Sequence, residues 1–184
     1  MNILVLVGSL RAGSTNRQLA DAAVAHLPES VTATVFEGLA DLPHYSEELD
    51  HDDTLPALAR DLREAVADAD ALLLVTPEYN GSMPSALKNA VDWASRPRGA
   101  SAVAGKAAAV IGASGSPRAA QWAREEGVKV LTVAGADVLE DTVGVGASFQ
   151  AFEDGRLSDA ELDAALRDLV HRLAEQPGRA HAAA

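Results

Sequence analysis

Cysteine is missing from this chain, which excludes a disulfide framework, a thiol nucleophile and a cysteine-based metal site. Positive charge is scarce, because 15 Lys and Arg stand against 27 Asp and Glu and give a formal net charge of −12. A strongly negative protein repels the phosphates of nucleic acids and of anionic membranes. We therefore expect neither of them as a partner.

Long apolar runs are missing too. No stretch approaches the roughly 18 residues of a membrane-spanning helix, and the first apolar run is too short for a signal peptide and has no basic lead. We therefore expect a cytoplasmic protein. The 184 residues fit one domain without internal repeats. We expect that domain over 1–176 and a disordered tail over 177–184.

Several catalytic motifs are also missing. Ser9 and Leu10 follow Gly8, so the dinucleotide pattern G-x-G-x-x-G is not formed, and no G-K-[ST] phosphate loop occurs. No histidine pair has HExxH spacing, and the first loop lacks the second glycine of a hydrolase nucleophile elbow. The acidic residues of 47–53 lack a regular ligand spacing, so we interpret them as a solvated face and expect no metal.

The most informative stretch present is 8–16, Gly-Ser-Leu-Arg-Ala-Gly-Ser-Thr-Asn, between an apolar run and an amphipathic segment. This order predicts a buried strand, a polar loop and the start of a helix. Free N–H groups at a helix N-terminus bind phosphate, and hydroxyl, amide and guanidinium groups add to such a site. The candidate phosphate ligands are Ser9, Arg11, Ser14, Thr15 and Asn16. The alternative is a loop that caps only its own helix.

A second polar loop follows the apolar run 70–75. Its candidate ligand-binding residues are Pro77, Glu78, Tyr79, Asn80 and Gly81. Exposed backbone groups and a ring that can stack suit a flat heteroaromatic ligand, whereas the alternative is an ordinary turn with polar surface residues. Since parallel strands end at one edge of a sheet, the two loops should be neighbours.

Apolar runs and amphipathic segments alternate along the chain, which predicts a doubly wound α/β fold with a parallel sheet. Strands are expected over 2–7, 31–36, 70–75, 105–111 and about 137–139. Helices are expected over 16–27, 54–68, 84–95 and 118–134, and a last helix after a capping box at 158–161. Thr54 is expected to cap the second of these helices.

The two loops together, in this order and at this separation, resemble the NADPH-dependent FMN reductase family. This flavodoxin-like group includes quinone, chromate and azo-dye reductases. The shared motifs are G-S-L-R-x-G-S-x-N and P-E-Y-N-x-x-x-P-x-x-L-K-N-x-x-D-W, and the likeness runs from the first strand to about residue 146. Residues 42–49 are similar to the family's loop after the second strand.

The resemblance implies a flavodoxin-like five-stranded sheet of order 2-1-3-4-5, with FMN as the cofactor and NADPH or NADH as the cosubstrate. The first loop would hold the FMN phosphate, and residues 77–81 would hold the isoalloxazine, largely through main-chain groups. FMN carries the hydride chemistry in such enzymes, so no catalytic side chain is expected.

A third loop, 112–118, falls at the same sheet edge, where Ser114 and Gly115 are expected to donate to the pyrimidine side of the flavin. The family often has further glycines where Ser116, Pro117 and Arg118 stand here. We consider Arg118 either a ligand of the nicotinamide nucleotide's phosphates or a surface residue.

The helix expected over 84–95 has two apolar stripes, and Trp93 lies on the second of them. A helix that is apolar on two sides is usually buried on two sides. We therefore predict a homodimer or homotetramer through this helix, as the resemblance also implies. The alternative is that Trp93 packs inside its own subunit.

The expected reaction is hydride transfer from NAD(P)H through N5 of FMN to an acceptor on the same flavin face, with ping-pong kinetics. Quinones are the first candidates, before azo compounds, nitroaromatics, chromate or free flavin. The alternative is an electron carrier or flavin-binding sensor that does not turn over nicotinamide. Positive charges expected near the site favour the reductase, because they attract an anionic nucleotide donor. These residues are Arg11, Arg17, Lys88, Arg96 and Arg98.

Overall fold

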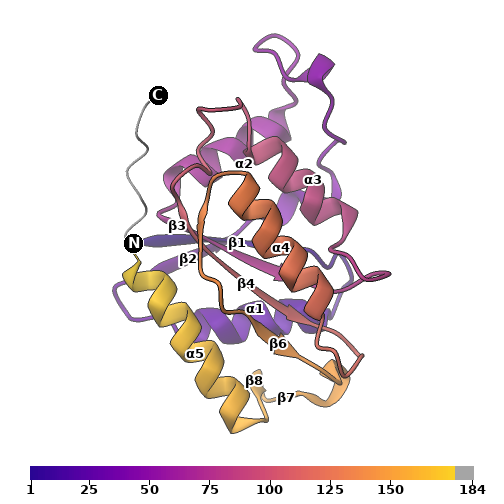
Figure 1. Ribbon diagram of the computed structural model, residues 1–184, viewed down its shortest axis with the longest axis vertical. Coiled ribbons are helices and arrows are strands. Elements are labelled where there is room, and N and C mark those ends of the chain that lie inside the picture. The colour runs from indigo at the N-terminus through magenta and orange to yellow at the C-terminus, as the bar shows by residue number, and fades with distance from the viewer. Residues whose placement is uncertain (177–184) are drawn as a thin grey trace.

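The computed structural model describes residues 1–176 as a parallel sheet between two helical layers (Figure 1). The strand order β2-β1-β3-β4-β5 confirms the expected flavodoxin-like topology. The strands on this path are β1 Asn2–Val7, β2 Thr32–Val35, β3 Ala71–Thr76, β4 Ala107–Ala113 and β5 Asp137–Val138. The tail expected over 177–184 lies outside the described residues.

The helices cover both faces of the sheet (Figure 1). α2 (Ala57–Asp68), α3 (Ser85–Ala94) and α4 (Gln121–Val133) pack on one face, and α1 (Thr15–Ala25) and α5 (Ala160–Glu175) pack on the other. Alternate residues of each strand enter opposite cores, so β1 directs Leu4 to the first layer and Val5 to the second. Both faces of the sheet are buried, which explains why β1, β3 and β4 are apolar without alternation.

The fifth strand position is occupied by two segments, whereas the sequence predicts a single strand there. β5 pairs with the start of β4, and β6 (Val143–Val145) pairs with its end, from Ile111 to Ala113, so the sheet has six strands. A short 3₁₀ turn, Ser148–Gln150, and a hairpin of β7 (Phe152–Glu153) and β8 (Arg156–Leu157) follow. These strands are too short to produce a readable periodicity.

Two helix starts differ from the expected ones. Thr54 does not cap α2, because its hydroxyl donates to the carbonyls of Glu48 and His51, at 3.2 and 3.4 Å. The helix starts only after Pro56, since proline disfavours a helical conformation at the residue before it. Asp159, not Ser158, caps α5, and its carboxylate accepts from two N–H groups of the first turn.

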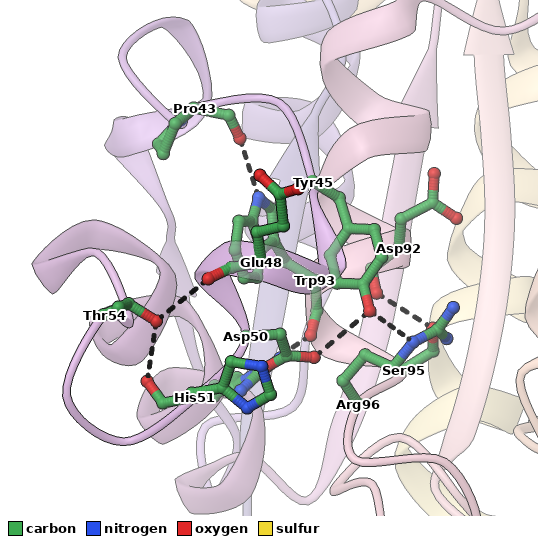
Figure 2. A network of polar contacts seen from close by, with 11 residues as sticks. Pro43, Tyr45, Glu48, Asp50, His51, Thr54, Asp92, Trp93, Ser95 and Arg96 are labelled. Carbon is green, nitrogen blue, oxygen red and sulfur yellow. Dashed lines mark hydrogen bonds and ion pairs between the residues drawn. The ribbon is translucent and has the colours of Figure 1, made fainter.

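The second apolar stripe of α3 is covered within the same chain, so the interpretation that Trp93 faces a partner is wrong. Trp93 is 0% exposed, and its indole N–H donates to the carbonyl of Pro43 at 2.7 Å (Figure 2). The Tyr45 ring packs edge-on against the indole, with ring centroids 4.9 Å apart. The long loop after β2 provides this burial, and its aperiodic sequence gave no sign of it.

Polar contacts fasten this loop to α2 and α3 (Figure 2). The Tyr45 hydroxyl donates to Asp50 at 3.2 Å and accepts from Nε of Arg96 at 3.0 Å. Asp50 also forms an ion pair with Arg63, at 2.6 Å. Within residues 1–176 no group of His, Asp and Glu is arranged to hold a metal ion, and none of the described helices is long and apolar enough to span a membrane.

Candidate functional site

A cavity of about 380 Å³ lies where β1, β3 and β4 end. All predicted site residues except Asn80 and Gly81 line it, and Ala113, Ser148 and Phe149 complete the wall. Its volume is in the range of small-molecule and cofactor sites, roughly 300–1,000 Å³. Parallel strand order explains why loops far apart in sequence meet here, since all the strands end at this edge.

The first loop directs the N-terminus of α1 at the cavity, as predicted. Ser14 is the N-cap, and its hydroxyl accepts from the N–H of Asn16 at 3.1 Å. Gly8 donates its N–H to Val75 at 2.8 Å, which fixes the loop to the end of β3. Gly13, at φ +66°, takes a left-handed conformation that glycine adopts without strain. The resulting helix terminus suits a phosphate group.

Asn16 is 2% exposed, and its amide pairs with the main chain at the end of β4. Its Oδ1 accepts from the N–H of Ala113 and its Nδ2 donates to the carbonyl of the same residue, both at 2.9 Å. We infer that Asn16 positions the first and third loops relative to each other. The groups of the first loop that remain to face the cavity are the Arg11 guanidinium, the hydroxyls and main-chain N–H groups.

The second loop forms a tight hairpin. Tyr79 and Ser82 exchange two main-chain hydrogen bonds, of 3.0 and 3.1 Å. Asn80 and Gly81 occupy the tip with φ of +53° and +76°, which is the pattern of a type I′ turn. Because they form the tip, they lie outside the cavity, whereas Tyr79 lines it and stays 54% exposed.

Two carboxylates clamp this hairpin to α4. Glu78 accepts from the N–H groups of Trp122 and Ala123, at 2.9 and 3.2 Å, and so caps that helix from another loop. Glu126 of α4 accepts in return from the Ser82 hydroxyl at 2.6 Å and from the N–H of Met83 at 2.7 Å.

The pKa of Glu126 lies below its ordinary value. Partial burial raises this pKa, but the hydrogen bonds from Ser82 and Met83 and the charges of Lys129 and Lys88 lower it by more. The ionised carboxylate is therefore the form that holds the hairpin.

The third loop is fixed from both sides. Ser114 donates its N–H to Val145 of β6 at 3.0 Å, and its hydroxyl accepts from the N–H of Ala120 at 3.1 Å. Arg124 lies beneath the loop and donates from Nε to Ala119 at 3.0 Å and from another nitrogen to Thr142. Burial lowers the pKa of this guanidinium. Gly115 lines the cavity.

Ser148 and Phe149 line the cavity but were not predicted. The Ser148 hydroxyl donates to that of Thr15 at 3.2 Å, and Phe149 is 78% exposed at the rim. They belong to a single 3₁₀ turn after β6. Gly144 and Gly146 precede this turn, but the segment matches neither of the motifs that identified the first two loops, so the sequence analysis missed it.

Most of the cations expected near the site lie elsewhere. Only Arg11 lines the cavity, whereas Lys88, Arg96 and Arg98 line a separate groove of about 670 Å³ between α3 and α4. Arg118 does not line the cavity either, because its guanidinium lies over the Trp122 ring, 4.2 Å from the ring centroid.

Comparisons with known proteins point to one family. The model of the NADPH-dependent FMN reductase family matches residues 1–150. A 2-hydroxy-1,4-benzoquinone reductase from Burkholderia is 52% identical over 114 residues, which cover 62% of this chain and 61% of that enzyme. This match spans less than two thirds of the Burkholderia enzyme.

A quinone reductase from Pseudomonas putida is 39% identical over 164 residues, which cover 86% of this chain and 85% of that enzyme. Among solved structures, the flavoenzyme NAD(P)H:(acceptor) oxidoreductase FerB from Paracoccus denitrificans superimposes with a TM-score of 0.84 at 31% identity, covering 95% of both chains.

Proposed function

Because this chain belongs to the NADPH-dependent FMN reductase family, we propose that it is an FMN-dependent oxidoreductase that transfers hydride from NAD(P)H to quinones. The observation that carries this proposal is the cavity at the ends of β1, β3 and β4, into which the phosphate-binding loop and two further loops converge. The names of the related quinone reductases support the choice of acceptor.

The residues around the cavity fit FMN. The N-terminus of α1, the Ser9 and Thr15 hydroxyls and the Arg11 guanidinium provide the donors that a phosphate dianion needs. Pro77, Tyr79 and Gly115 line the other part of the cavity, where main-chain groups and an aromatic ring suit the flat ring system. We assign these two groups of residues to the two ends of FMN.

When bound, FMN supplies the hydride chemistry. The chain's own residues bind and orient the ring. We propose that main-chain N–H groups of the third loop, including that of Gly115, stabilise negative charge at the pyrimidine side. The N–H groups of Asn80 and Gly81 are poorer candidates than the sequence suggested, because these residues lie outside the cavity.

We propose that the donor and the acceptor use this one site in turn, which predicts ping-pong kinetics. Quinones are the proposed acceptors, and azo compounds, nitroaromatics, chromate and free flavin are further candidates.

We also propose that the chain forms a homodimer through α3 and the neighbouring α4. The groove between these helices exposes apolar surface, since Val133 is 81% exposed, and its walls carry both charge signs through Lys88, Lys129 and Asp92. A surface with apolar residues and both charge signs suits contact with a second copy.

Steady-state oxidation of NADPH and NADH by the FMN-loaded protein, with 1,4-benzoquinone as acceptor, tests the proposed function. We expect turnover and parallel double-reciprocal lines when both substrates are varied. Intersecting lines would contradict the ping-pong order. Absence of turnover in protein that binds FMN would favour an electron carrier or sensor.

A further inference from the structure

The first loop, residues 8–16, which we propose binds the FMN phosphate, has a second cavity on the side away from the flavin cavity. This outer cavity, of about 350 Å³, lies between residues 9–13, Arg17 on α1 and residues 35–40, which include the end of β2. Ser9 and Arg11 line both cavities, so the loop is a shared wall between them. A molecule that crosses the loop can therefore occupy both.

The outer cavity combines an apolar lining with two guanidinium groups. Val7, Val35, Phe36 and Leu39 contribute the apolar surface, and Leu10 extends it with a side chain that is 55% exposed. Such a surface suits one face of a nucleobase, and guanidinium groups suit phosphate. The lining therefore has the two features that a phosphorylated nucleoside requires.

The charges of this cavity are not balanced. Arg11 has no ion-pair or hydrogen-bond partner for its guanidinium within residues 1–176, whereas Arg17 pairs with Glu37 at 2.8 Å and with Asp21 at 3.2 Å. Glu37 is the one carboxylate in the lining, and Asp21 offsets Arg17 from outside it. Arg11 is therefore the guanidinium of this cavity whose charge no carboxylate of the described residues offsets, and in a chain with a net charge of −12 this charge favours an anionic ligand.

We propose that the outer cavity binds the adenosine 2′-phosphate end of NADPH, an inference that rests on the proposed function. Arg17 binds the 2′-phosphate and selects NADPH over NADH. Glu37 competes with the phosphate for Arg17, so it weakens binding. Since Arg17 does not line the flavin cavity, it acts on the cosubstrate and not on FMN.

Calorimetric titration of the FMN-loaded protein with adenosine 2′,5′-bisphosphate tests this inference without turnover. We expect Arg17→Ala to weaken binding about five- to tenfold, as for loss of a charged hydrogen bond to phosphate. Glu37→Gln should tighten it about threefold, because Arg17 then loses one of its two competing carboxylates and keeps only Asp21. Arg167→Ala, on exposed α5 surface, removes the same charge and should leave binding unchanged.

Adenosine 5′-monophosphate is the matched ligand, and its binding should not respond to Arg17→Ala. The inference is overturned if the bisphosphate binds no more tightly than the monophosphate, or if Arg17→Ala binds it as the unsubstituted protein does. The inference is also overturned if Glu37→Gln changes the affinity for the monophosphate more than the affinity for the bisphosphate. That result would assign the cavity to NADH.

Reduction of the bound flavin, measured on the same preparations, separates this inference from the proposed function. In Arg17→Ala we expect a higher KM for NADPH with unchanged kcat, unchanged KM for NADH and unchanged FMN affinity. Bisphosphate binding that depends on Arg17, without flavin reduction by NADPH, would support the site and contradict the reductase. If NADPH reduces the flavin but Arg17→Ala leaves the affinity for the bisphosphate unchanged, the proposed 2′-phosphate site is contradicted and the proposed function is not.

Discussion

Asn16 illustrates how one side chain can hold two loops of the site in place. Its amide completes the hydrogen bonds of both main-chain groups of Ala113, 97 residues away in the sequence. A truncated side chain would leave a buried N–H and a buried carbonyl unpaired, because little water reaches this position.

Asn16→Ala should therefore lower the free energy of unfolding by about 2–4 kcal/mol. Urea denaturation measures this change. Gln121→Ala, which removes an exposed amide from α4, should cost less than about 0.5 kcal/mol. A loss in Asn16→Ala as small as that of the control would show that the bridge to Ala113 does not support the fold.

Arg11→Ala should weaken FMN binding about tenfold, because a guanidinium binds phosphate through charged hydrogen bonds. Flavin fluorescence titration measures the affinity, and kcat at saturating FMN should change little. Arg118→Ala is the control, since Arg118 lies against Trp122 and does not line the cavity. Equal FMN affinities in the two variants would remove Arg11 from the site.

The sequence identified the residues whose role depends on neighbours along the chain. Ser14 could be predicted as a helix-terminal residue because its cap is local, and Arg11 could be placed beside it at the cavity because it lies in the same polar loop, whereas its binding of phosphate stays a prediction. The roles of Asn16 and Ser148 could not be predicted, since each depends on a partner more than 90 residues away. Pairings at that separation are set by the fold and leave no local pattern.

The hairpin over 79–82 depends on its two residues with positive φ. Gly81→Ala should destabilise the protein by about 1–2 kcal/mol, since φ +76° strains any residue with a Cβ. The new Cβ would also lie 3.1 Å from the Trp122 ring. Asn80→Gly is the control and should be tolerated, because glycine adopts positive φ freely.

Thermal unfolding gives the stability of both hairpin variants, and the visible absorbance of bound flavin reports displacement of Tyr79. If Gly81→Ala were as stable as Asn80→Gly, with an unaltered flavin spectrum, the hairpin would not shape the site.

The clamp between Glu126 and the hairpin predicts a dependence of stability on pH. The pKa of Glu126 is lowered in the folded state from its ordinary 4.5. Its contribution is thus fully present above that value and disappears as pH falls through the lower folded pKa. Unfolding free energies measured between pH 6 and the acid limit should fall more steeply for the unsubstituted protein than for Glu126→Gln.

Glu125→Gln, on the exposed side of the same helix, is the matched variant and should retain the steep fall. If Glu126→Gln and the unsubstituted protein responded to pH alike, the carboxylate would not hold the hairpin in its ionised form.

Element types followed from the sequence pattern, but several element ends did not. The buried strands β1, β3 and β4 were expected from continuous apolar runs, and the five described α-helices from regular apolar spacing. The delayed start of α2 depends on the residue before Pro56, and the division between β5 and β6 depends on where each pairs with β4. Such boundaries are set by local backbone sterics and by tertiary pairing.

The assembly of the whole molecule is predicted to be a dimer through the groove between α3 and α4. Val133→Glu should dissociate it, because a charge would enter the apolar part of the interface at a residue that is 81% exposed in the isolated chain. Ala164→Glu on α5, in the opposite helical layer, should leave the dimer intact.

Light scattering coupled to gel filtration measures the mass of both variants. A monomeric mass for the unsubstituted protein at micromolar concentration, or an intact dimer in Val133→Glu, would contradict this interface.

The central claim is that the cavity binds FMN and that NAD(P)H reduces it there. Anaerobic addition of NADPH, and separately of NADH, to the FMN-loaded protein while the visible flavin band is recorded tests this most directly. We predict that the band of protein-bound flavin bleaches, and faster with NADPH than with NADH. A bound flavin that neither nucleotide bleaches, or a protein that binds no flavin, would contradict the claim.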